Sequence, residues 1–129
     1  MKLFVYGTLL HGECNHHVLE EAKLLFKGLT LQAIMYDTGN GYPAIELSKD
    51  SVVIGDVYEV PDHMWASLDE LEGYTGDPNR DLYTKQMVHI QTEGGVLDAA
   101  VYTVCDETMK KVVIPSGDWI AYRKAYDIK

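Results

Sequence analysis

The chain has 129 residues, of which 47% are apolar and 24% charged, a composition typical of a folded domain and not of a disordered chain. Its formal net charge of −9 at pH 7 argues against nucleic acid and anionic membrane surfaces as partners, because both attract Lys and Arg. A chain of this length is the usual size of one domain, so we expect a single domain over residues 1–129. No apolar run approaches the roughly 18 residues of a membrane-spanning helix.

The first predicted strand covers residues 2–7, which are rich in Phe, Val and Tyr and which we interpret as a strand rather than a signal peptide. A turn over residues 8–12 and a short helix over residues 16–22 follow it. The apolar stretch 24–36 favours a second strand, in which the interior Gly28 predicts a bend or bulge. The N-terminal part of the chain is therefore predicted to be mostly β-structure.

The middle of the chain predicts two strands and then the longest helix. The strands cover residues 43–47 and 52–60, and Gly55 in the second is a candidate for a bulge. The helix is predicted over residues 61–72. Proline is favoured in the first turn of a helix and occurs at position 61, and glycine is favoured directly after the last helical residue and occurs at position 73.

The clearest local signal is a β-hairpin of strands 83–91 and 96–104, joined by the glycine-containing turn 93–95. The residues after 104 predict only a short helix or coil at the C-terminus. When a chain this short contains many antiparallel strands and one clear helix, its strands usually curl into a barrel or a strongly twisted sheet. The predicted class is therefore α+β, a small mixed and mostly antiparallel β-barrel flanked by short helices.

One carboxylate is conspicuous because it interrupts the apolar face of the helix 61–72. That face carries Met64, Trp65, Leu68 and Leu71. At about 100° per residue, Glu72 falls inside the same stripe. Burial raises the pKa of a carboxyl group toward neutrality, and the negative end of the helix dipole acts in the same direction. Glu72 is therefore a candidate general acid or base.

Ordinary structural explanations stay open for the acidic residues of this helix. Glu72 lies in the last turn, where a side chain can reach water. Asp69 lies at the margin of the stripe. We expect it either to accept a hydrogen bond from a neighbouring loop or to be exposed to solvent. Glu70 points to the opposite side, toward solvent.

The loop Tyr6–Leu9, directly after the first strand, is a second candidate for function. Gly7 permits backbone conformations closed to other residues, so that several N–H groups can point one way and bind an anion. Thr8 adds a hydroxyl group. A plain β-turn is the alternative interpretation of these four residues.

Four segments occur in a characteristic order along the chain: Tyr6–Leu9 followed by Gly12 and Asn15-His16, then Gly41–Ala44, Val57–Val60 and Leu68–Glu72. Together they resemble the γ-glutamyl cyclotransferase-like (AIG2-like) family, which includes the γ-glutamylamine cyclotransferases. The resemblance implies a small mixed barrel with a pocket at one rim.

The resemblance also implies roles for individual residues. The catalytic glutamate of the family corresponds to Glu72, the residue that the helical pattern selects. The substrate-binding loop of the family corresponds to Tyr6, Gly7, Thr8 and Leu9. Apart from this correspondence, Tyr42 and Tyr122 are candidates for the substrate-binding wall on the leaving-group side, and ordinary partly buried tyrosines are the alternative interpretation of both.

The implied reaction is intramolecular. The α-amino group of a γ-glutamyl substrate attacks the γ-carbonyl group, and 5-oxoproline and a free amine or amino acid are released. Glu72 moves the proton, and no metal or organic cofactor is required. We expect a cytoplasmic enzyme that is a monomer or weak homodimer, with a small-molecule γ-glutamyl compound as its partner.

Two alternative functions are also compatible with parts of the sequence. The first is a non-catalytic small-molecule binding or regulatory module on the same fold. The second is a Ca²⁺ or Mg²⁺ site, which is disfavoured because the acidic residues match no loop signature and are better explained as a solvated face. These acidic residues are Asp56, Glu59, Asp62, Asp69, Glu70, Glu72, Asp77 and Asp81.

Histidines and cysteines add no stronger signal. His11, His16 and His17 lack zinc-ligand spacing. Cys14 and Cys105 are isolated thiols without CxxC spacing, which fits a reducing cytosol better than a disulfide.

Overall fold

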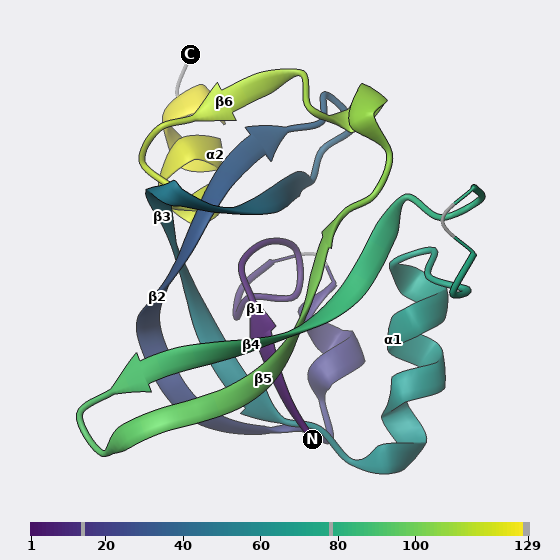
Figure 1. The fold of residues 1–129 in the computed structure, drawn as a ribbon, viewed down its shortest axis with the longest axis vertical. Coiled ribbons are helices and arrows are strands. Elements are labelled where there is room, and N and C mark those ends of the chain that lie inside the picture. The colour runs from purple at the N-terminus through teal and green to yellow at the C-terminus, as the bar shows by residue number, and fades with distance from the viewer. Residues whose placement is uncertain (14, 78, 128–129) are drawn as a thin grey trace.

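The computed structural model describes residues 1–13, 15–77 and 79–127, which form a curled six-stranded sheet with two short α-helices (Figure 1). In sheet order the strands are β4 (Tyr83–Thr92), β5 (Gly95–Val104), β1 (Lys2–Val5), β3 (Pro43–Glu59), β2 (Lys23–Asp37) and β6 (Val112–Ile114). The α-helices are α1 (Trp65–Leu71) and α2 (Trp119–Asp127), and short 3-10 helices cover His16–Leu19, Asp62–Met64 and Glu107–Met109. The predicted α+β class with a barrel-like curl is confirmed.

The short strand β1 lies at the centre of the sheet. It pairs antiparallel with β3 and parallel with β5, whereas the other pairs among the described strands are antiparallel. Successive side chains of a strand point to opposite faces. Leu3 and Val5 therefore pack in the hydrophobic cluster under α1, and Phe4 and Tyr6 pack in the cluster on the other face. The end of β1 is thus held from both faces and both edges.

The long strands β2 and β3 are less regular than the hairpin β4–β5. The predicted bend in β2 is confirmed, because Gly28 has a φ of +69° and the pairing register shifts between Phe26 and Leu29. The two strands predicted in the next segment belong to one strand, β3, which runs from Pro43 to Glu59. Its pairing with β2 still separates the two predicted segments, because Ala33 pairs with Leu47 and Gln32 with Val52, so that residues 48–51 are skipped.

Gly55 marks a close approach of two strands, and the bulge predicted at this position is not present. A Cβ atom here would lie 2.2 Å from the Val5 carbonyl oxygen and 2.6 Å from the Phe4 ring. The register shifts nearby belong to β2. Glycine is needed at this position because it lets β1 lie directly on β3.

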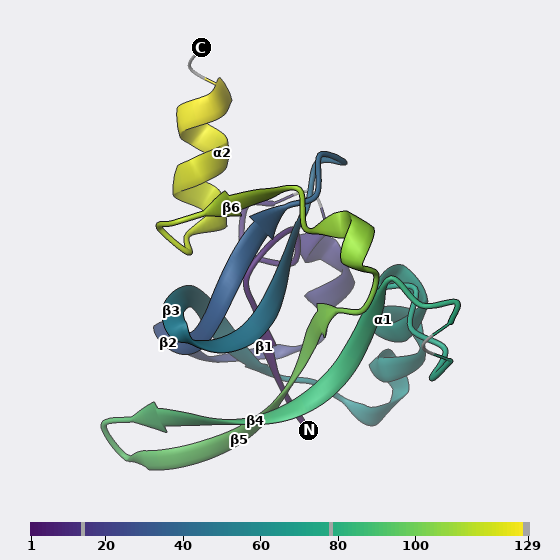
Figure 2. The same ribbon diagram turned by 45° about the horizontal axis from the view of Figure 1, so that its top comes forward.

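The C-terminal segment contains two elements that the sequence pattern missed, β6 and the 3-10 helix before it. β6 extends the sheet by pairing with the end of β2. The Gly117 carbonyl group then accepts a hydrogen bond of 2.8 Å from the Ile54 N–H, and Trp119, with 4% of its surface exposed, begins α2 in the core. Figure 2 shows α2 beside β6 at this end of the sheet.

The helix that carries the conspicuous glutamate ends where the sequence predicted. Gly73 has a φ of +68°, its N–H donates to the Glu70 carbonyl oxygen at 3.1 Å, and the Tyr74 N–H donates to that of Asp69 at 2.8 Å. These two bonds form a Schellman ending, which fixes the position of Glu72. No helix in the described ranges is long and apolar enough to cross a membrane.

Candidate active site

A cavity of about 250 Å³ lies where β1 ends, with the loop after this strand on one side and the end of α1 on the other. Its lining consists of Phe4, Val5, Tyr6, Gly7, Thr8, Leu9, Asn15, Tyr42, Pro43, Leu71, Glu72, Leu82, Tyr83 and Tyr102. All six residues that the sequence predicted for the site are brought together here. Tyr122 is not in this lining, and its hydroxyl donates to the Asp37 carboxylate at 2.7 Å.

Glu72 has the properties of a proton-transfer group. Burial raises the pKa of its carboxyl group from the ordinary 4.5 to about 7. None of the described residues donates a hydrogen bond to this carboxylate, so its oxygens are available to a ligand in the cavity. A carboxyl group with a pKa near neutrality can both accept and return a proton at physiological pH.

The apolar stripe of the helix is only partly as predicted. Leu68 is fully buried, but Leu71 keeps 39% of its surface exposed. The reason is that the helix ends at this residue, so its side chain lies at the rim of the cavity instead of in the core. Leu82, with 40% exposed, lies at the same rim and gives it an apolar surface.

The loop Gly7–Leu9 offers hydrogen-bond donors to the cavity. No described residue accepts a hydrogen bond from the N–H groups of its three residues, whereas the next N–H, that of Leu10, donates to the Gly7 carbonyl oxygen at 3.0 Å. Buried N–H groups are almost always paired, so free ones beside a cavity point to a ligand or water. A Cβ atom at Gly7 would lie 2.7 Å from the Pro43 ring, so only glycine fits.

Asn15 orders this loop from the side. Its Nδ2 donates to the Thr8 Oγ1 at 3.0 Å, and its backbone N–H donates to the Thr8 carbonyl oxygen at 2.9 Å. The Thr8 hydroxyl accepts from Asn15 and therefore keeps its own proton for another partner.

Three buried tyrosines form the rest of the polar wall. Tyr6 donates its hydroxyl proton to the Tyr102 carbonyl oxygen at 2.6 Å, and Tyr83 donates to that of Pro43, also at 2.6 Å. Tyr102 donates to the Asp69 carboxylate at 2.6 Å. Burial is the largest cause that raises the pKa of all three phenols, so they stay neutral and act as fixed walls.

Sequence reasoning did not assign Tyr83 and Tyr102 to the site. The signal that locates them is strand alternation, since both lie in the same hydrophobic cluster as Ala100 on the face of the hairpin that α1 covers. The pairing of β1 with β5 then brings Tyr102 next to Tyr6. That pairing joins residues far apart in the chain, and no local pattern predicts it.

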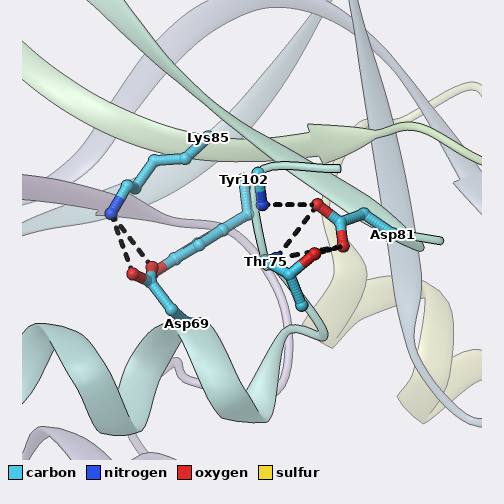
Figure 3. Close-up of polar contacts among 6 residues, drawn as sticks. Asp69, Thr75, Asp81, Lys85 and Tyr102 are labelled. Atoms are coloured by element: carbon cyan, nitrogen blue, oxygen red, sulfur yellow. Dashed lines mark hydrogen bonds and ion pairs between the residues drawn. The ribbon is translucent and has the colours of Figure 1, made fainter. Parts of the chain in front are cut away.

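Asp69 is a structural acceptor, although its partners are strand side chains and not a loop. Figure 3 shows its carboxylate between Lys85 and Tyr102. The Lys85 Nζ lies 3.0 Å and 3.1 Å from the two carboxylate oxygens and also sits 5.0 Å from the centre of the Trp65 ring. These contacts fasten α1 to β4 and β5 while Glu72, one turn further along the chain, faces the cavity.

The other acidic residues are used in separate places. Asp81 accepts hydrogen bonds from the N–H and hydroxyl of Thr75 (Figure 3) and from the Gly76 N–H. Asp56 accepts from the Gly28 N–H at 3.0 Å. No group of three His, Cys, Asp or Glu residues in the described part of the chain is arranged to hold a metal ion. Cys14 lies outside the described residues, so the state of the two thiols stays a prediction.

Comparison with known proteins gives a consistent result. The profile of the family described as gamma-glutamyl cyclotransferase, AIG2-like, matches residues 3–121. The gamma-L-glutamyl-butirosin B gamma-glutamyl cyclotransferase of Niallia circulans is 40% identical over 94 residues, which is 72% of this chain and 60% of that protein. The gamma-glutamylaminecyclotransferase of Bos taurus is 30% identical and covers 90% of this chain and 73% of its own length.

A solved structure supports the same relationship. YkqA from Bacillus subtilis is 27% identical and superposes with a TM-score of 0.78 over 99% of this chain and 42% of YkqA. The chain therefore spans less than half of YkqA and 60% of the Niallia circulans protein.

Proposed function

The chain belongs to the gamma-glutamyl cyclotransferase, AIG2-like family, and on this premise we propose that it cyclises a γ-glutamyl compound, releasing 5-oxoproline and a free amine or amino acid. Glu72 is the proposed acid and base. The proposed binding loop is Tyr6–Leu9, and Tyr42 is a further lining residue proposed to bind the substrate. We propose that the reaction needs neither a metal nor an organic cofactor.

The observation that carries this proposal is the environment of Glu72. Its carboxylate lies in the cavity with a pKa of about 7, receives no hydrogen bond from the described residues, and shares the cavity with the free N–H groups of Gly7–Leu9. The reaction requires a base that can take a proton from the substrate and hydrogen-bond donors that can bind its negative charge. The Glu72 carboxylate supplies the first and the N–H groups of Gly7–Leu9 supply the second.

The chemistry follows from these positions. The Glu72 carboxylate takes a proton from the α-ammonium group, and the free amine then attacks the γ-carbonyl carbon to close a five-membered ring. Glu72 returns the proton to the departing nitrogen as its bond to that carbon breaks. The ring nitrogen then gives its second proton to Glu72, which passes it to the released amine, so that a neutral lactam and an ammonium ion remain. The N–H groups of Gly7–Leu9 supply donors for the substrate carboxylate or for the oxyanion. Holding the substrate folded makes the attack effectively unimolecular.

The size of the cavity indicates which part of the substrate it holds. Its volume of about 250 Å³ is below the range of about 300–1,000 Å³ for pockets that enclose drug-sized ligands. It therefore suits the glutamyl part, while the leaving group extends past Leu71 and Leu82 at the rim. The leaving group then contacts an apolar and partly exposed surface.

The test is an assay of the purified chain with a panel of γ-glutamyl amines, γ-glutamyl amino acids and a γ-glutamyl aminoglycoside. The measurement is the amount of 5-oxoproline and of free amine. We expect equal amounts of both from at least one compound, and a fall in rate of about 10²–10⁴-fold in Glu72→Gln. If no panel compound yields 5-oxoproline but 5-oxoproline still binds, the chain is a binding module. An unchanged rate in Glu72→Gln overturns the proposed role of Glu72.

A further inference from the structure

Two consecutive residues of α2 make contacts at two different loops that lead into the cavity. Arg123 contacts the loop between β1 and the first 3-10 helix, and Tyr122 contacts Asp37, the last residue of β2, where the loop to β3 begins. The first loop supplies Gly7–Leu9 and Asn15 to the lining, and the second supplies Tyr42. Neither Tyr122 nor Arg123 lines the cavity itself, so any effect on the site must pass through these loops.

The contact of Arg123 is a two-point ion pair with Glu13. The Arg123 Nε lies 2.8 Å from the Glu13 Oε1, and its Nη2 lies 2.7 Å from the Oε2. The Glu13 side chain is only 5% exposed. A buried carboxylate is costly without a partner, and paired Arg–carboxylate geometry is among the strongest side-chain contacts. Glu13 therefore depends on α2 for its present position.

Glu13 is connected to the binding loop by short steps. Its N–H donates to the Leu10 carbonyl oxygen at 2.9 Å, and the Leu10 N–H donates to that of Gly7 at 3.0 Å. Two residues beyond Glu13, Asn15 holds both the carbonyl and the hydroxyl group of Thr8. A displacement of Glu13 is thus transmitted to the residues that carry the free N–H groups.

The contact of Tyr122 reaches the second loop through Asp37. The Tyr122 hydroxyl donates to the Asp37 Oδ2 at 2.7 Å, and the Gly39 N–H donates to the Oδ1, also at 2.7 Å. The neighbouring Thr38 then donates its hydroxyl proton to the Tyr42 carbonyl oxygen at 2.7 Å. The loop is closed on itself, and its start is anchored in the sheet, where Asp37 pairs with Pro43 and Val112. The Tyr122 contact adds a side-chain restraint from α2 at that point.

We propose that Tyr122 and Arg123 are positioning residues, and that α2 acts as a clasp that holds the two loops of the substrate cavity in register. Arg123 fixes the loop that presents the N–H donors, and Tyr122 fixes the loop that presents Tyr42. The effect on catalysis rests on the proposed function, whereas the effect on the loops does not.

Hydrogen–deuterium exchange on the full chain tests the clasp without any substrate. The variants are Arg123→Met, the milder Arg123→Lys, and Tyr122→Phe, with Lys124→Met as the control on the exposed side of the same helix. We expect Arg123→Met to speed exchange about tenfold or more at the hydrogen-bonded N–H groups of Leu10 and Glu13, with Arg123→Lys intermediate. Tyr122→Phe should speed exchange in residues 38–40 only.

The outcomes separate a clasp from a general loss of stability. Faster exchange confined to the matching loop, with Lys124→Met equal to wild type, supports the proposal. Unchanged loops overturn it, and so does acceleration spread evenly over the chain in all variants, because α2 would then be merely part of the core.

Kinetics with an active γ-glutamyl compound then test the consequence for the site. We expect Arg123→Met to raise KM about tenfold while the pH dependence set by Glu72 stays unchanged. If the wild-type chain releases no 5-oxoproline, the proposed function is refuted. The hydrogen–deuterium exchange experiment still tests whether α2 holds the two loops, because it needs no substrate. A loosened loop with an unchanged KM overturns the link between the clasp and substrate binding.

Discussion

The Tyr102 hydroxyl donates a hydrogen bond of 2.6 Å to the carboxylate of Asp69, three residues before Glu72 in the chain. Lys85 binds the same carboxylate from β4. The helix end that presents Glu72 is therefore fastened to the neighbouring strands by a charged contact, in addition to its apolar face. This relationship makes Asp69 a useful probe of how firmly Glu72 is held.

Replacing Asp69 by Asn removes the charge partner of Lys85. The two side chains keep only 26% and 21% of their surface exposed, so Lys85 cannot regain full hydration. We expect the free energy of unfolding to fall by about 1–3 kcal/mol. Urea unfolding measures it, with Glu70→Gln on the exposed side of α1 as control. Equal midpoints for Asp69→Asn and Glu70→Gln would contradict the role given to this contact.

The pH dependence of turnover should report the ionisation of Glu72. The proposed base is the carboxylate form, and burial raises its pKa to about 7. The value of kcat/KM is therefore expected to rise with pH up to about 7 and then to level off on this limb. A pH–rate profile measures it. An acid limb that persists unchanged in the residual activity of Glu72→Gln would assign the limb to another group.

The same group should make stability depend on pH. The folded protein retains a proton on Glu72 between the ordinary pKa of 4.5 and about 7, whereas the unfolded chain has released it. The free energy of unfolding therefore falls as pH rises through this window, by about 3 kcal/mol in total from this residue. Glu72→Gln lacks this loss and should become more stable than wild type above about pH 7. Urea unfolding at several pH values tests it, and a difference that does not vary with pH would rule it out.

Gly7→Ala should damage the site without removing a functional group. The added Cβ would lie 2.7 Å and 2.9 Å from two ring carbons of Pro43, so the loop or the proline must move. Overpacking of this kind costs about 1–3 kcal/mol. We expect lower stability and a higher KM. Gly94→Ala in the hairpin turn is the matched control, since its nearest neighbour would be 3.9 Å away. Equal behaviour of both variants would show that Gly7 is not constrained.

The sequence predicted the elements whose signals are local. The hairpin β4–β5, the bend at Gly28 and the end of α1 at Gly73 each depend on a glycine or on strand alternation, and all three are confirmed. β6 was missed because three residues are too few for a pattern, and its pairing with β2 comes from tertiary structure. Gly55 was misread because a glycine inside a strand signals a bulge and a close approach equally well.

The residues of the candidate site also fall into those with a local sequence signal and those that only the tertiary structure brings together. Glu72 and the loop Tyr6–Leu9 are visible in the sequence because a carboxylate in an apolar stripe and a glycine after a strand are unusual locally. Tyr83 and Tyr102 are ordinary strand residues in the sequence, and only the neighbouring strands and loops place them in the wall. The contacts of Arg123 with Glu13 join residues 110 positions apart, and neither residue carries a local signal of it.

The tight contact between Gly55 and Val5 should limit which substitutions the chain accepts at positions outside the cavity. Gly55 is not part of the cavity lining, yet any larger residue there would push away the strand from which the binding loop starts. In a mutational scan for activity, Gly55 should therefore tolerate as few substitutions as Gly7. Gly117, whose Cβ would lie 2.1 Å from the Val52 carbonyl oxygen, should show comparable intolerance at its own close contact with β3. Intolerant positions in such a scan would thus outline the strand contacts that aim the pocket as well as the pocket itself.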